Sequence, residues 1–163
     1  MKINNSTLFN VGIIAACGAV FGFQLLHQLQ PLPRSTAVLE PGERVKGVEG
    51  LQESGKTLIL ITASTCHFCT ESMTFYRKLS SLARSRGTRL VGVSWESPER
   101  NRAYLTSHGV DVDEIVSASK TSIGIRGTPT VILVNSRGVV LNSWPGKLDE
   151  PTETEVLNAA MVN

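Results

Sequence analysis

Two cysteines, Cys66 and Cys69, stand where a strand-like run passes into a helix-like pattern. Residues 58–62 are mostly β-forming, and the residues after Cys69 repeat apolar side chains at helical spacing. Cys66 is therefore expected at a helix N-terminus, where the helix dipole and neighbouring groups can lower a cysteine pKa from about 8.5 to roughly 3.5–7.5. Cys69, one helical turn further on, can resolve the mixed disulfide that Cys66 forms. The pattern predicts a dithiol redox site at a strand–helix junction.

Three other uses of the cysteine pair fit this sequence less well. A structural zinc site needs four ligands, but the other candidates are one cysteine in an apolar stretch and three scattered histidines. A static disulfide would close a very short loop and remove little entropy from the unfolded chain. A peroxidatic cysteine is typically preceded by Pro and by Thr or Ser at fixed distances, and neither stands at those positions before Cys66. Thiol-disulfide exchange is the favoured interpretation, and we expect neither a metal nor a cofactor.

A second motif, residues 123–138, contains the step Thr128-Pro129 followed by a β-branched run. Proline cannot donate to a β-ladder and belongs at a strand start or edge, so an ordinary trans proline that begins a strand is one interpretation. The segment also closely resembles the stretch around the cis-proline of thioredoxins. That resemblance implies a cis bond before Pro129, packing of Thr128 and Pro129 opposite the dithiol, and backbone groups of Thr128 that bind an extended client strand.

Strands and helices alternate along the rest of the chain. Strands are predicted at 57–62, 89–95, 114–117, 130–135 and 139–143, and helices at 68–86, 98–108 and 151–161. Ser97 is expected to cap the middle helix, with Pro98 at its first position and Gly109 after its end. The order is similar to that of the thioredoxin fold, an α/β fold whose central mixed sheet is flanked by helices on both faces.

An apolar segment precedes this domain. Leu8 to Leu26 comprises 19 residues without a charge, and such a helix would rise about 28 Å, close to the roughly 30 Å hydrocarbon core of a bilayer. The segment predicts an N-terminal transmembrane helix kept as an anchor, while cleavage as a signal and lipidation at Cys17 remain alternatives. The short tail before it favours a domain outside the cytoplasm, on the periplasmic side of the inner membrane in a Gram-negative cell. The expected division is an anchor or signal segment at 1–29, a linker leading into the domain at 30–50, and a thioredoxin-like domain at 51–163.

Within the thioredoxin-like superfamily, the chain most resembles the membrane-tethered extracytoplasmic branch that includes TlpA, ResA and relatives serving cytochrome c maturation. The helix at 98–108 between two strands, and the segments 135–140 and 144–148, carry this resemblance. It implies a thiol-disulfide oxidoreductase with disulfide- or dithiol-bearing protein clients and a membrane or extracytoplasmic redox partner. The formal net charge of +2 is too small to indicate binding of nucleic acid.

The sequence departs from the family pattern around the cysteines. Leu60 replaces the buried Asp that thioredoxins carry six residues before the first cysteine, and Thr65 replaces the usual Trp. Ser72 stands where the cytochrome-serving branch often has Glu. Glu71 and Glu96 either assist the second thiol or are ordinary surface carboxylates. A non-catalytic binding or assembly factor is therefore the alternative function.

His67 lies inside the motif and is the residue expected to tune its redox properties. A protonated imidazole would stabilise the Cys66 thiolate and make the disulfide more oxidising. A solvent-facing histidine with little effect is the other interpretation, so the sequence leaves open whether the protein reduces or oxidises its clients.

Overall fold

The structure, a computed structural model, describes residues 39–49, 55–121, 123 and 127–161. All of these belong to one compact unit, Ala37–Asn163. Within them, no helix has the length and apolar character needed to cross a membrane. The predicted anchor at 1–29 lies outside the described residues.

One mixed sheet forms the centre of this unit, with the strand order β3-β2-β1-β4-β5. β1 pairs in parallel with β2 and antiparallel with β4, while β3 extends the parallel side and β5 the antiparallel side. The predicted order of strands along the chain is confirmed; the ends of β3 and β4 are as predicted, and those of the other strands differ by at most two residues. The strands are β1 (Lys56–Ile61), β2 (Arg89–Ser94), β3 (Glu114–Ser117), β4 (Thr130–Asn135) and β5 (Val140–Pro145).

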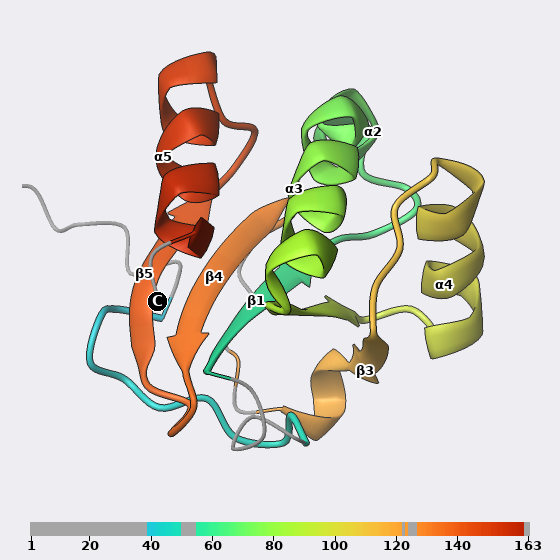
Figure 1. Cartoon of the computed structure of the whole chain (residues 1–163). Helices are drawn as coiled ribbons and strands as arrows, with labels where there is room; N and C mark the ends of the chain where they lie inside the picture. Colours follow the sequence, from blue (N-terminus) through green and yellow to red (C-terminus); the bar gives the residue numbers. More distant parts are fainter. Residues whose placement is uncertain (1–38, 50–54, 122, 124–126, 162–163) are drawn as a thin grey trace, which may run out of the picture. The chain divides into compact units, whose positions relative to one another are not determined.

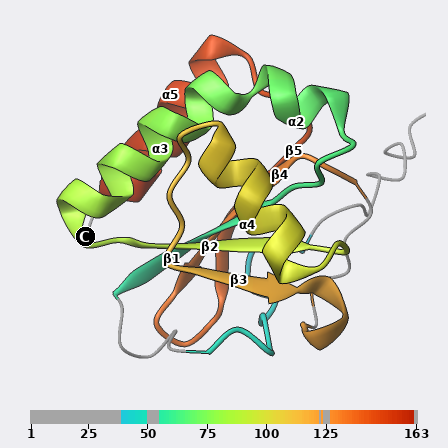
Figure 2. The same cartoon turned by 90° about the vertical axis from the view of Figure 1, so that its right-hand side faces the viewer.

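Helices cover one face of this sheet, as Figures 1 and 2 show. Side chains of α3, α4 and α5 share a buried cluster with alternate residues of the strands, including Leu58 and Leu60 of β1. The β1 residues between them, Ile59 and Ile61, face a second cluster on the opposite side, as the two-residue period of a strand requires. The helices are α2 (His67–Glu71), α3 (Met73–Arg86), α4 (Pro98–Ser107), the 3₁₀ helix η1 (Ala118–Lys120) and α5 (Glu150–Met161).

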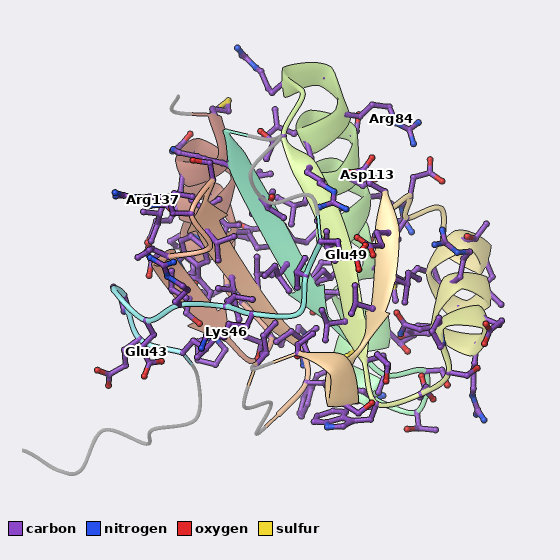
Figure 3. All side chains as sticks on the ribbon, turned by 90° about the horizontal axis from the view of Figure 1, so that it is seen from below. Glu43, Lys46, Glu49, Arg84, Asp113 and Arg137 are labelled. Atoms are coloured by element: carbon purple, nitrogen blue, oxygen red, sulfur yellow. The ribbon has the colours of Figure 1, made fainter. Side chains whose placement is uncertain are left out.

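For the residues that the structure describes, the expectation of helices on both faces is wrong as regards the α-helices, because α3, α4 and α5 all pack on one face. The second face is covered by η1 and by residues 39–49, whose Val45 and Val48 are buried against it. The reason is that the described part of the chain between β3 and β4 forms only the three-residue η1, too short to cover a sheet. Figure 3 shows residues 39–49 running across this face, with Lys46 and Glu49 labelled on it.

The predicted single helix at 68–86 is in fact two helices, α2 and α3, that meet at Ser72. The Ser72 N–H donates to the carbonyls of both Phe68 and Cys69, each at 3.2 Å, and its hydroxyl donates to the Phe68 carbonyl at 2.8 Å. Such bonds tighten a helical turn and bend the axis. The dithiol therefore lies on a short helix of its own.

The predicted caps of α4 are confirmed. The Ser97 hydroxyl accepts from the Arg100 N–H at 3.3 Å, and Pro98 occupies the first turn. Gly109 follows the helix with φ +71°, a left-handed conformation that glycine adopts without steric cost. These caps fix where α4 begins, directly beside the end of β2.

Candidate active site

The two cysteines lie at the edge of the sheet where β1 ends. Ile61, the last residue of β1, is paired with Thr130, the first residue of β4. The turn after β1 and the segment before β4 therefore start side by side, although they are far apart in the sequence. Cys66 stands on the first of these segments and Thr128 on the second.

Cys66 is the N-cap residue of α2, with the extended backbone angles φ −86° and ψ 112°. Its sulfur accepts a hydrogen bond from the Cys69 N–H at 3.3 Å, and its thiol donates to the Thr128 carbonyl at 3.4 Å. The Cys66 side chain is partly exposed, whereas Cys69 is fully buried. Only Cys66 is accessible to a large partner.

The surroundings of the two thiols separate their pKa values. Partial burial raises the pKa of Cys66, but hydrogen bonds from the Cys69 and Thr128 side chains and from backbone N–H groups outweigh it and leave that pKa below its ordinary value. Burial and the hydrogen bond to Cys66 raise the pKa of Cys69 to about 12. Cys66 is thus the thiol that ionises first as the pH rises, and Cys69 the one that keeps its proton at neutral pH.

The bond between Thr128 and Pro129 is cis, as the resemblance to thioredoxins implied. The Pro129 carbonyl accepts from the Gly146 N–H at 2.7 Å, which ties this loop to the end of β5. The contact between the Cys66 thiol and the Thr128 carbonyl confirms that this loop lies opposite the dithiol. The binding of a client strand by Thr128 and Pro129 stays a prediction.

His67 lies on the exposed rim of the site. Its side chain is 79% exposed, and its Nε2 lies 3.0 Å from the Glu71 carboxylate. Lys147, in the turn after β5, lies 2.7 Å from the other oxygen of Glu71, and this hydrogen bond lowers the pKa of Glu71. Glu71 thus contacts both His67 and Lys147, and the tuning role of His67 stays a prediction.

A second polar group, not predicted as a unit, lies on the other side of the dithiol turn. The Glu96 carboxylate accepts from both the N–H and the hydroxyl of Ser64, at 2.7 and 2.6 Å, and Arg100 Nε lies 3.3 Å from it. The only sequence signal for this contact was that Ser64 and Glu96 each follow the end of a neighbouring strand, a place where polar side chains of parallel strands meet.

Behind the cysteines the core is apolar where thioredoxins carry Asp. Leu60 is fully buried in β1. Two hydroxyl groups from helices, those of Tyr104 in α4 and Thr70 in α2, lie 3.0 Å apart. Tyr76 of α3 is buried, and its burial raises its pKa far above the ordinary value. No three His, Cys, Asp or Glu side chains of the described chain are grouped to hold a metal ion.

A cysteine pair on a short helix after the central strand, opposite a cis-proline, defines a protein with a thioredoxin-like fold. Three similar solved structures are a candidate thioredoxin from Neisseria meningitidis, a candidate thiol:disulfide interchange protein DsbE from Chlorobium tepidum, and a thiol-disulfide isomerase from Corynebacterium glutamicum. Their TM-scores are 0.55, 0.54 and 0.53 at identities of 19%, 20% and 15%. The alignments cover 69%, 75% and 83% of this chain, and 79%, 99% and 99% of theirs. At such identities the likeness shows the fold alone.

The family follows from the sequence itself. The sequence model of the Redoxin family matches residues 30–160, most of the chain. The chain therefore belongs to the Redoxin family. No curated protein sequence is significantly similar to it.

Proposed function

We propose that this protein is a membrane-anchored, extracytoplasmic thiol-disulfide oxidoreductase that acts on protein clients, in the maturation of cytochromes c or other metalloproteins. One observation carries the enzymatic part of the proposal. The accessible Cys66 has a lowered pKa, while its buried neighbour Cys69 has a pKa of about 12. This asymmetry gives one thiol the role of attacking a client and the other the role of releasing it.

In the reducing direction, the Cys66 thiolate attacks one sulfur of a client disulfide. A bond forms between Cys66 and the client, and the other client sulfur leaves as a thiolate that takes a proton from water. Cys69 then loses its proton and attacks the Cys66 sulfur. The internal disulfide forms, the second client sulfur leaves, and two electrons have passed to the client. A dithiol redox partner returns two electrons to the protein, and the reverse sequence would oxidise a client dithiol.

Client binding is assigned to the loop opposite the dithiol. Thr128 presents its carbonyl to the Cys66 sulfur, at a place where an extended client segment can pair with the backbone and bring its own sulfur to Cys66. Phe68, inside the motif, is 55% exposed and offers an apolar contact beside the reacting sulfur.

Anchoring and location rest on the sequence. The uncharged segment from Leu8 to Leu26 has the length of a transmembrane helix, and an oxidising compartment outside the cytoplasm suits a protein that exchanges disulfides. The partners are then disulfide- or dithiol-bearing proteins and a redox partner in or near the same membrane.

A binding or assembly factor with an incidental dithiol is the second candidate. The fully buried Leu60 favours it, because no carboxylate lies in the core at the position where thioredoxins hold the proton acceptor for the second thiol.

An insulin-reduction assay distinguishes the oxidoreductase from the binding factor. It uses the full-length protein in detergent, with a dithiol reductant as the source of electrons. We expect the wild-type protein to accelerate the reaction, and Cys66→Ser to abolish the acceleration. Cys17→Ser is the matched control, because it removes the remaining cysteine of the chain and should leave the rate unchanged. A wild-type rate equal to that of Cys66→Ser would favour the binding factor.

A further inference from the structure

The turn that delivers Cys66 is held by a carboxylate from the neighbouring strand end. Glu96 follows β2, and its side chain is only 16% exposed. Its two carboxylate oxygens accept the N–H and the hydroxyl of Ser64 at 2.7 and 2.6 Å. Arg100, from the first turns of α4, donates to the Ser64 hydroxyl at 3.1 Å and lies 3.3 Å from Glu96. One charged group thus ties this turn to β2 and α4.

These contacts make Glu96 a poor proton acceptor. Partial burial raises the pKa of Glu96, but the two hydrogen bonds from Ser64 and the charge of Arg100 outweigh it, so the pKa lies below its ordinary value. A carboxylate that binds its proton weakly and whose oxygens are already occupied is unsuited to take the proton of a thiol with a pKa of about 12. Of the two roles open to Glu96, assistance to Cys69 as a base is the one its surroundings disfavour.

Ala63, the residue directly before Ser64, connects the contact with Glu96 to both thiols. The Ala63 carbonyl accepts from the Cys66 N–H at 3.1 Å. The Ala63 N–H is a hydrogen-bond partner of the Cys69 sulfur that lowers the pKa of that thiol. Because Ala63 directly precedes Ser64, a shift of Ser64 would displace groups that hold both cysteines.

A second tie between this turn and α4 supports the same role. Asn101 of α4 is fully buried, and its Nδ2 donates to the Thr62 hydroxyl at 3.1 Å. Thr62 is also fully buried and its N–H donates to the Val93 carbonyl at 3.1 Å. The start of the turn is therefore fixed in the core by Asn101, and the half-buried Ser64, two residues after Thr62, is fixed by Glu96.

We propose that Glu96 is a positioning residue that, through Ser64 and Arg100, holds the turn before Cys66 in the geometry that thiol exchange needs. This proposal rests on the function proposed above. It assigns to Glu96 no contact with the client and no proton transfer.

The direction in which Glu96→Gln changes the pKa of Cys66 distinguishes a positioning role of Glu96 from a simple effect of its charge. Glu96→Gln can accept only one of the two Ser64 hydrogen bonds, so the turn loosens and the hydrogen bonds that stabilise the Cys66 thiolate weaken. The pKa of Cys66 should then rise, by about half a unit to one unit. A carboxylate that acted only through its negative charge would have the opposite effect, because its neutralisation would favour the nearby thiolate and lower the pKa of Cys66.

Glu99→Gln is the matched control. Glu99 is exposed in the first turn of α4, and its neutralisation removes the same charge three residues away without touching Ser64. Ser64→Ala removes the hydroxyl bond and keeps the N–H bond, so it should raise the pKa of Cys66 by less than Glu96→Gln. The double variant should show less than the sum of the two shifts, because both changes remove the same hydroxyl contact.

The assay is thiolate absorbance against pH on the full-length protein, with the alkylation rate of Cys66 and the thermal midpoint recorded for each variant. A fall in the pKa of Cys66 in Glu96→Gln, or no change beyond that in Glu99→Gln, overturns the proposal. If Glu96→Gln does not fold, Ser64→Ala alone decides by the same criterion. These measurements need no client. If the protein did not reduce insulin, the proposed function would be refuted, but the pKa values of Cys66 in the variants would still test the positioning role of Glu96.

Discussion

The difference in reactivity between the two thiols is the most direct consequence of the site geometry. The pKa of Cys69 is about 12 and that of Cys66 lies below 9.0. At neutral pH the thiolate fraction of Cys66 therefore exceeds that of Cys69 by at least about a thousandfold. The thiolate of Cys69 is intrinsically more nucleophilic because its thiol is less acidic. With a Brønsted coefficient of about 0.4–0.5, this reduces the expected ratio of the two rates by roughly 15- to 30-fold. We expect Cys66 to be alkylated at least about 30 times faster than Cys69, with burial of Cys69 widening the gap.

The assay is a time course of iodoacetamide labelling of the reduced protein at pH 7, with the two sites resolved by peptide mass spectrometry. Because both cysteines lie close together in the sequence, fragmentation of the peptide that contains both is used to assign each label to Cys66 or Cys69. The Cys66 rate should rise with pH and level off at a pKa below 9.0, while the Cys69 rate should still be rising there. Equal rates at pH 7, or faster labelling of Cys69, would refute the assignment of attacking and resolving thiols.

Three further predictions follow from the same site. Cys69→Ser should accumulate a mixed disulfide between Cys66 and an extracytoplasmic client, seen as an adduct in membrane fractions that reductant removes; absence of any adduct would favour the binding factor. His67→Ala should raise the pKa of Cys66 and make the disulfide less oxidising. The reduction potential should change by less than about 30 mV, because the imidazole is largely exposed and contacts Glu71. An unchanged equilibrium with glutathione would show that His67 does not tune the site. As the pH rises from about 9 towards 12, the free energy of unfolding of the reduced protein should fall relative to that of Cys69→Ala, by up to about 1.4 kcal/mol per pH unit. The reason is that the pKa of Cys69 is raised in the folded protein, so the unfolded chain releases this proton at a lower pH. Denaturation midpoints of the two proteins that change in parallel over this range would argue against a buried, protonated Cys69.

The sequence predicted those parts of the fold that short-range patterns specify. The strand before Cys66 and the Ser97 cap of α4 were each marked by residues whose conformational preferences are strong. The cis bond before Pro129 was predicted from the resemblance to thioredoxins instead. The break at Ser72 was not predicted, because it depends on where one hydroxyl points rather than on hydrophobic periodicity. The cover of the second sheet face was mispredicted because residues 39–49, in which Leu39, Val45 and Val48 stand among charged residues, have no helical or strand pattern of their own.

The candidate site also has a part that the sequence predicted, the cysteine pair, and a part that it did not, the contact between Ser64 and Glu96. The spacing of Cys66 and Cys69 was enough to predict an attacking and a resolving thiol, since one helical turn separates them. The contact between Ser64 and Glu96 joins residues 32 positions apart, and it becomes visible only when the register of β1 and β2 is known. Polar pairs of this kind are set by tertiary structure, so a single sequence marks them no more clearly than ordinary surface residues.

The replacement of the usual buried Asp by Leu60 raises the question of how Cys69 becomes reactive, and the causes of its raised pKa supply an answer. Burial is the first cause, and the hydrogen bond and charge of Cys66 follow. When Cys66 is joined to a client in a mixed disulfide, its sulfur is neutral, so the part of the raised pKa that comes from Cys66 disappears. The Ala63 N–H and the Thr128 side chain, which lower the pKa of Cys69, remain in place. Formation of the mixed disulfide therefore lowers the pKa of Cys69 at the step that needs its thiolate, so hydroxide or water can take the proton without a dedicated carboxylate.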